Sequence, residues 1–178
     1  MKKVVVISTS LRSKSNSAAL AEQFVKGAVD AGCDMDVITL HGKTIGFCTG
    51  CLACQKTGCC VIDDDANAIT EKVLNADVVA FATPIYYYEM SGQMKVLIDR
   101  MNSMYPKEYK FRDVYFLSTA AEDEDNVPMR AEEGLQGWID CYEKASLKSS
   151  VFCGGVNDAG DIDGNDKLNA AYEMGKTV

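Results

Sequence analysis

The sequence predicts an α/β protein built on a five-stranded parallel sheet with helices on both faces. Two observations lead to this prediction. Short continuous runs of β-branched residues are typical of strands buried on both faces, and segments with helical spacing of apolar residues lie between them. Because strands and helices alternate along the chain, parallel pairing through helical crossovers is expected. With 178 residues, a single domain over residues 1–178 is expected.

The expected strands are apolar runs that end at polar or glycine-containing turns. The first, Lys3–Ser8, is a continuous run of valine and isoleucine after its first lysine. In open parallel sheets, ligands bind outside the carboxyl ends of the strands, so function is expected in the loops that follow them. The later strands are Met35–Leu40, Val78–Ala82, Val114–Ser118 and Ser150–Cys153.

The expected helices show apolar residues at intervals of three and four. After Ser91, which can cap a helix, Met94, Leu97, Ile98 and Met101 follow the i, i+3, i+4, i+7 pattern. The other helices are expected to begin with Asn16 or Ser17 as N-cap, after Asp63–Asp65, in the segment Met129–Lys144 and in the segment Asp166–Met174.

Composition and charge exclude several classes of partner. The net charge is -8 and the pI is about 4.7, and this negative charge argues against nucleic acid or an anionic membrane as partner. Lys2 and Lys3 precede only the short apolar run Val4–Ile7, so a signal peptide is not indicated. No stretch approaches the roughly 18 apolar residues that span a bilayer. We therefore expect a cytoplasmic protein with reduced thiols.

The loop Ser8–Ser17 reads S-T-S-L-R-S-K-S-N-S and is rich in hydroxyl and amide groups. It leads into a helix, whose first backbone N–H groups lack intrahelical partners and lie at the positive end of the helix dipole. Together with Arg12 or Lys14, these donors favour a terminal phosphate. No G-x-G-x-x-G and no Walker lysine motif is present, so neither dinucleotide nor P-loop chemistry is indicated. The alternative is an ordinary polar turn.

The segment Thr83–Met90 contains three consecutive tyrosines just beyond the third strand. Aromatic and backbone groups at such a position can bracket a flat ring and bind its edge. The alternative is that two of the tyrosines belong to the core or to a subunit interface. A phosphate-binding loop after the first strand and an aromatic loop after the third match a mononucleotide lying across this edge of the sheet.

Five of the eight cysteines lie in residues 48–60, which we call the cysteine segment and which leaves the same edge after the second strand. Three follow a C-x2-C-x2-C pattern, and a fourth candidate lies close behind. This spacing favours a [4Fe–4S] cluster, since a zinc ribbon needs two C-x2-C knuckles with a longer insert. Zinc and free or reversibly oxidised thiols are the alternatives. The candidate ligands are Cys48, Cys51, Cys54 and either Cys59 or Cys60.

Four stretches resemble the flavodoxin-like NAD(P)H-dependent FMN reductases, in the same order and over nearly the whole chain. They are S-T-S-L-R-S-K-S-N-S, C-T-G-C-L-A-C-Q-K-T-G-C-C-V-I-D-D-D, T-P-I-Y-Y-Y-E-M-S-G-Q-M-K-V-L-I-D-R and S-T-A-A-E. The third is the most specific, and the second resembles the iron–sulfur flavoprotein branch of this family. The resemblance implies a flavodoxin-like three-layer fold with strand order 2-1-3-4-5.

The resemblance also implies FMN as the cofactor and suggests which residues hold it. Its phosphate would be held by Ser10, Arg12, Ser15, Asn16 and Ser17. Its isoalloxazine ring would be lined by Pro84, Ile85, Tyr86 and Tyr87, and the pocket would be closed by Thr119, Ala120 and Ala121. The resemblance favours Cys60 as the fourth cluster ligand. One departure from the family is Thr9, where relatives often carry Gly.

The resulting expectation is an FMN-dependent oxidoreductase that passes electrons from NAD(P)H or a ferredoxin to an acceptor, with the flavin as the catalyst. A homodimer or a dimer of dimers with the flavin near the interface is expected, because three tyrosines are too many for one ring. Two alternatives are a non-catalytic electron carrier or thiol redox sensor of the same fold, and a zinc-stabilised interaction module.

Overall fold

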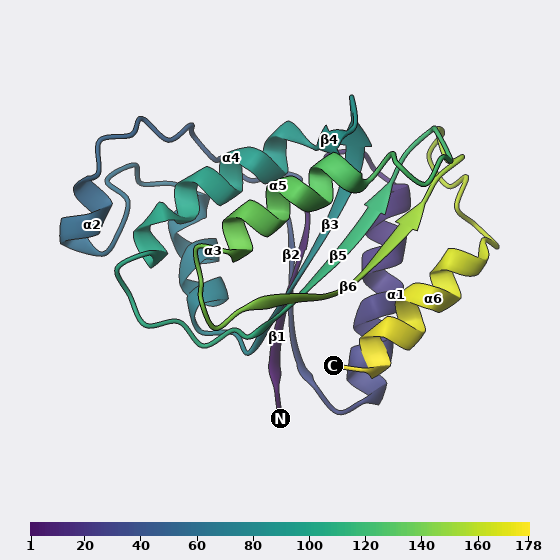
Figure 1. The fold of residues 1–178 in the computed structure, drawn as a ribbon, viewed down its shortest axis with the longest axis horizontal. Helices are drawn as coiled ribbons and strands as arrows, with labels where there is room; N and C mark the ends of the chain where they lie inside the picture. The colour runs from purple at the N-terminus through teal and green to yellow at the C-terminus, as the bar shows by residue number, and fades with distance from the viewer.

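A computed structural model describes all 178 residues and places one sheet between two layers of helices (Figure 1). The sheet order is β2-β1-β3-β5-β6, with the short β4 paired to β3. All pairs on this path are parallel, and β4 is antiparallel to β3. When β4 is set aside, this is the predicted order, so the flavodoxin-like fold is confirmed. The strands are β1 Lys3–Ser8, β2 Asp34–Thr39, β3 Val78–Tyr86, β4 Glu89–Met90, β5 Asp113–Thr119 and β6 Ser146–Cys153.

The helices form two layers, with α1 and α6 on one face of the sheet and α3, α4 and α5 on the other (Figure 1). A short helix, α2, lies in the cysteine segment, outside both layers. None of these helices combines the length and the hydrophobicity that a bilayer-spanning segment requires. Their bounds are α1 Asn16–Asp30, α2 Ala53–Thr57, α3 Asp65–Leu74, α4 Gly92–Arg100, the 3₁₀ helix η1 Met101–Met104, α5 Met129–Ile139 and α6 Asp166–Lys176.

The first strand, β1, is buried on both of its faces. Val5 and Ile7 belong to the core beneath α3, α4 and α5, whereas Val4 and Val6 belong to the core beneath α1 and α6. All four are fully buried. This two-sided burial explains why the strand is a continuous apolar run and not an alternating one.

The third strand is longer than predicted. We expected it to end at Ala82 and to continue as a loop, but β3 runs through Pro84 to Tyr86 and then turns back into β4. Its pairing with β1 stops at Ala82, while pairing with β5 continues to Pro84. Beyond Ala82 the strand is therefore an edge on one side, where proline is tolerated. The predicted aromatic loop is thus a β-hairpin.

Two helix starts show how hydroxyl groups set the ends of the loops. Ser15 is the N-cap of α1, and its side chain accepts a hydrogen bond of 3.5 Å from the Ala18 N–H, so the predicted Asn16 or Ser17 cap was one or two residues late. Ser91 caps α4 as predicted, with a hydrogen bond of 3.3 Å from the Met94 N–H. Side chains at such positions satisfy N–H groups that the helix leaves unpaired.

Candidate functional site

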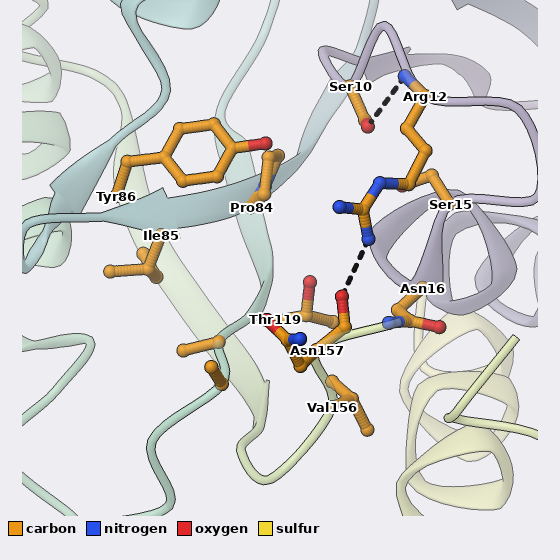
Figure 2. A pocket seen from close by; sticks show the side chains of 12 residues that line it. Ser10, Arg12, Ser15, Asn16, Pro84, Ile85, Tyr86, Thr119, Val156 and Asn157 are labelled. Carbon is orange, nitrogen blue, oxygen red and sulfur yellow. Dashed lines mark hydrogen bonds between the residues drawn. The ribbon is translucent and has the colours of Figure 1, made fainter. Parts of the chain in front are cut away.

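The carboxyl ends of β1, β3, β5 and β6 meet at one edge of the sheet, where the structure has a cavity of about 140 Å³ (Figure 2). We call it the polar cavity. Every predicted cofactor residue lines it except Ser17 and Tyr87. Its lining residues are Ser10, Arg12, Ser15, Asn16, Pro84, Ile85, Tyr86, Thr119, Ala120, Ala121, Val156 and Asn157.

A second cavity of about 510 Å³ adjoins the polar cavity and is mostly hydrophobic. We call it the tyrosine chamber. The two share five lining residues, and the chamber is where the predicted ring residue Tyr87 lies. A polar end joined to an apolar end suits a ligand that carries a phosphate at one end and a flat ring at the other. The chamber is lined by Ile85, Tyr86, Tyr87, Tyr88, Ala120, Ala121, Glu122, Val127 and Asn157.

The polar cavity lies at the N-terminus of α1, which has no acidic residue in its first turn. The positive end of the helix dipole is therefore not compensated by the chain, a condition that favours a bound anion. Ser15 faces the cavity, and its hydroxyl lies 3.0 Å from the hydroxyl of Ser17. Ser17 is fully buried, so it supports Ser15 from behind and does not face the cavity itself.

Arg12 spans the polar cavity. Its guanidinium extends from the first loop to the segment after β6, where Nη1 donates a hydrogen bond of 2.6 Å to the Asn157 carbonyl (Figure 2). This contact places a positive charge beside the helix N-terminus. Val156 and Asn157 were not predicted as site residues. They follow the fifth expected strand at the same sheet edge, and that position was the signal that could have identified them.

The side chain of Asn16 binds protein groups and not the cavity. Its Nδ2 donates to the Asp158 carbonyl at 2.9 Å, and its Oδ1 accepts from the N–H groups of Gly160 and Ile162 at 3.1 and 3.4 Å. The side chain therefore ties the start of α1 to the loop before α6. What Asn16 offers to a ligand is its backbone N–H in the first turn of the helix.

A buried hydroxyl network holds the first loop against β3 and α4. The Thr9 N–H donates to the Ala82 carbonyl at 2.9 Å, and Thr9 Oγ1 lies 3.1 Å both from that carbonyl and from Ser91 Oγ. Thr83 Oγ1 donates to Ser91 Oγ at 3.1 Å. Thr9, Thr83 and Ser91 are each fully buried. Threonine at position 9 thus connects three elements of the site through its backbone and its side chain.

The loop after β5 presents one free backbone donor to both cavities. The Ala120 N–H is bonded to the Cys153 carbonyl at 3.1 Å, and its carbonyl accepts from the Val156 N–H at 2.9 Å. The Ala121 N–H has no acceptor in the structure, although Ala121 lines both cavities. This N–H is available to the polar edge of a ring.

The cysteine segment lies away from these cavities. It leaves the sheet edge after β2 but then runs along α4, so that Cys48 lies near Lys95 and Asn102. Cys54 Sγ accepts a hydrogen bond of 3.6 Å from Asn102 Nδ2, beyond the end of α4. Figure 1 shows α2 at the end of α4 that is far from β4. The cysteine segment was expected at the same sheet edge as the cofactor, and only the start of the segment lies near that edge.

The thiols of the cysteine segment are free, and no three His, Cys, Asp or Glu side chains come together as a metal-binding group. The predicted ligands Cys48, Cys51, Cys54 and Cys60 are therefore not gathered here, and the cluster stays a prediction. The donors are of the right kind, because exposed thiolates are soft ligands. Hydrogen bonds from the Ala53 backbone and the Thr49 side chain hold the pKa of the Cys51 thiol below its usual value.

Arg100, the last residue of α4, binds residues that flank the cysteine segment on both sides, and we call these contacts the Arg100 clamp. Its Nη1 and Nη2 donate to the two carboxylate oxygens of Asp64 at 2.6 and 2.9 Å. The same guanidinium donates to the carbonyls of Gly46 at 2.8 Å and Ile62 at 3.0 Å. The Arg100 side chain is fully buried, and that of Asp64 is 6% exposed. The ends of the segment are thus fixed, while most of the thiols between them are exposed.

Comparison with known proteins identifies the family of the chain. The sequence profile described as NADPH-dependent FMN reductase matches residues 2–137. An iron–sulfur flavoprotein of Methanocaldococcus jannaschii is 34% identical over 98 residues, which are 55% of this chain and 51% of that protein. An iron–sulfur flavoprotein of Methanosarcina thermophila is 30% identical over 111 residues, 62% of this chain and 58% of that protein. The matched part is thus little more than half the length of these relatives.

The fold has counterparts among solved structures. The crystal structure of an azoreductase from Bacillus anthracis superposes with a TM-score of 0.75 and covers 100% of both chains. The two sequences are only 15% identical, so this likeness concerns the fold alone.

The clamp predicts a pH-dependent loss of stability in the variant Asp64→Asn. Burial raises the pKa of Asp64, but hydrogen bonds from Arg100 and from the Gly46 and Ala66 N–H groups outweigh it and hold the pKa below its usual value. Because the folded-state pKa lies below the unfolded-state value, the carboxylate stabilises the fold above about pH 4, and this contribution disappears as the pH falls through the folded-state pKa.

We expect Asp64→Asn to lower the free energy of unfolding by about 3 kcal/mol near neutral pH, because it leaves the buried Arg100 without its charge partner. Urea denaturation at several pH values measures this difference, which should shrink in acid. Asp63→Asn is the control, since Asp63 is exposed, and it should change stability by less than about 0.5 kcal/mol. An Asp64→Asn effect as small as that of the control would contradict the clamp.

Proposed function

The chain belongs to the NADPH-dependent FMN reductase family, and from this premise we propose that it is an FMN-dependent oxidoreductase. It takes electrons from NAD(P)H or a ferredoxin and passes them to a second acceptor. One observation carries this proposal: the polar cavity and the tyrosine chamber adjoin each other at the same sheet edge. The polar cavity lies at the N-terminus of α1, where no acidic residue offsets the positive end of the helix dipole. A phosphate and a flat ring, joined in one molecule, match these two environments.

The phosphate of FMN would lie in the polar cavity. The donors there are the backbone N–H groups at the start of α1, the hydroxyl groups of Ser10 and Ser15, and the guanidinium of Arg12. Hydrogen bonds between a cation and an anion are stronger than neutral ones, so Arg12 is the side chain on which phosphate affinity should depend most. Asn16 contributes its backbone, and Ser17 supports Ser15.

The isoalloxazine ring would lie in the tyrosine chamber, between the hairpin and the loop after β5. Ile85, Tyr86 and Tyr87 would line it from the hairpin. Pro84, on the same strand, lines the polar cavity beside it. Thr119, Ala120 and Ala121 would close the pocket from β5.

When bound, FMN supplies the hydride and electron chemistry of the reaction. The residues of the chain bind the cofactor, orient it and limit the access of water. The Ala121 N–H, which has no acceptor within the chain, would donate to the polar edge of the ring and stabilise negative charge there. The apolar side chain of Ile85 shields part of the chamber from water. We assign no side chain as a general acid or base.

We further propose that the cysteine segment holds a [4Fe–4S] cluster through Cys48, Cys51, Cys54 and Cys60. The names of the two relatives support this, as do the spacing of the thiols and the lowered pKa of Cys51. Since the thiols are not gathered in the structure, binding requires residues 48–60 to close around the metal. Fixed ends and an exposed middle are compatible with such a closure, and we derive no electron-transfer step from it.

We propose a homodimer or a dimer of dimers in which the tyrosines of the hairpin meet a second copy of the chain. Tyr87 is 97% exposed and Tyr86 is 53% exposed, an unusual exposure for adjacent aromatic side chains. Two-fold symmetry is the commonest arrangement of such assemblies. Sedimentation of the FMN-bound protein should give at least a dimer at micromolar concentration, and a monomer would contradict the proposal.

The phosphate contact predicts that the protein prefers FMN to riboflavin. Replacing Arg12 with alanine should weaken FMN binding by roughly ten- to a hundredfold, since a hydrogen bond to a charged group contributes about 1.5–3 kcal/mol. Riboflavin affinity should stay nearly constant. Flavin fluorescence titrations measure both, and Lys14→Ala is the control because Lys14 lies on the same loop but does not line the cavity. Equal affinity of the unaltered protein for the two flavins would overturn the assignment.

The cluster assignment predicts stoichiometric iron and sulfide after anaerobic reconstitution. Cys60→Ala should lose the cluster, whereas Cys59→Ala should retain it, because only Cys60 belongs to the proposed ligand set. Iron and sulfide analysis with Mössbauer spectroscopy distinguishes the variants. The assignment is wrong if iron does not bind, or if Cys59→Ala loses the cluster and Cys60→Ala keeps it.

A further inference from the structure

Two sulfur atoms of the cysteine segment already accept hydrogen bonds from N–H groups. The Gly50 N–H donates to Cys48 Sγ at 3.5 Å, and this donor comes from within the segment. Asn102 Nδ2 donates to Cys54 Sγ at 3.6 Å, and this donor lies on η1, outside the segment. Both acceptors belong to the predicted ligand set. Asn102 therefore connects a predicted metal ligand to the helical framework of the domain.

A left-handed residue precedes the short helix that carries Cys54. Leu52, the N-cap of α2, has φ 57° and ψ 9°, a conformation that residues other than glycine rarely adopt. Its side chain is exposed, so burial in the core does not compensate for the strain. Strain of this kind is typical of ligand-binding sites. Directly after Leu52, α2 begins and packs against η1, with Cys54 in its first turn.

Asn102 also lines a cavity of about 530 Å³ that is bordered by the cysteine segment, α4, η1 and α5. We call it the η1 cavity. Cys48 and Gly50 line this cavity from the cysteine segment, and Lys95 lines it from α4. Asn102 thus lies between two predicted ligands, because its amide binds Cys54 and it shares a cavity with Cys48. The η1 cavity offers Cys48 the space to approach Cys54 when residues 48–60 close.

The hydrogen bond from Asn102 becomes stronger when Cys54 loses its proton. A neutral thiol is a weak acceptor, whereas a hydrogen bond to an ionised group is roughly twice as strong as a neutral one. A metal ion binds the thiolate, and the thiol proton is released to solvent. The Asn102 N–H therefore interacts more favourably with a metal-bound Cys54 than with a free one, and this difference contributes to metal affinity.

We infer that Asn102 is a positioning residue of the thiol metal site. Its side chain fixes the sulfur of Cys54 beside the η1 cavity and keeps its hydrogen bond to that sulfur when a metal ion binds. Partners of this kind orient metal ligands and contribute to affinity without touching the metal. The inference rests on the proposal that the cysteine segment holds metal, but it does not depend on which metal is bound.

The test uses Co²⁺ alone as the probe, because bonds between Co²⁺ and thiolates give a charge-transfer absorption band. The full chain, freed of iron and flavin and kept reduced, is titrated anaerobically with Co²⁺ against a competing chelator. Two variants lose the N–H donor: Asn102→Leu keeps nearly the volume of the side chain, and Asn102→Ala does not. The control is Asn169→Leu, since Asn169 is exposed on α6, across the sheet from α4.

Both Asn102 variants should bind Co²⁺ roughly ten- to a hundredfold more weakly than the unaltered protein, which is the usual cost of removing a partner of a metal ligand. Their charge-transfer band should move to longer wavelength, because a sulfur without its hydrogen bond gives up electrons more easily. Asn169→Leu should change neither the affinity nor the band.

The position of the band separates this role from a purely structural one. A variant that merely loosens the fold binds Co²⁺ more weakly but leaves the band where it was. The inference is overturned if the Asn102 variants bind Co²⁺ as tightly as the unaltered protein, if their band does not move, or if the unaltered protein gives no thiolate band.

The inference and the cluster assignment fail in different ways. If anaerobic reconstitution yields no bound iron and sulfide, the cluster assignment is wrong. The Co²⁺ titration requires no cluster, so its outcome decides on Asn102 alone.

Discussion

The parallel pairing of β1 with β3, and of β3 with β5, is the constraint on which the site depends. This register sets Ser8 beside Ala82 and Pro84 beside Thr119, so three loops far apart in sequence leave the sheet at one edge. The hydroxyl network of Thr9, Thr83 and Ser91 then locks the first of these loops to β3 and to the start of α4. Backbone pairing brings the loops to one edge of the sheet, and the hydroxyl network fixes the position of the first loop relative to β3 and α4.

A second constraint separates the cysteine segment from the two cavities. The nine residues of α4 lie between the hairpin and the Arg100 clamp, a length of roughly 13 Å at the usual rise of a helix. The cysteine segment is anchored at the far end of this helix and the cofactor cavities at the near end. Within one chain, the thiols of the cysteine segment therefore lie beside α4 and η1, outside both cofactor cavities.

Much of the fold could be predicted because its signals are local. The buried run of β1 and the serine cap of α4 follow from residue types at fixed spacing, and both agree with the structure. The extension of β3 into a hairpin was missed because Pro84 looks like a strand end, whereas it lies where β1 no longer flanks β3. The side-chain contacts of Asn16 reach the loop after β6, and no local pattern reveals such a contact.

We propose that the polar cavity and the tyrosine chamber together hold one FMN molecule. A crystal structure of the protein grown with FMN would show where the cofactor lies. We expect the phosphate at the start of α1 beside Arg12, and the ring between the hairpin and Ala121. A phosphate bound elsewhere, or a ring lying outside the tyrosine chamber, would contradict it.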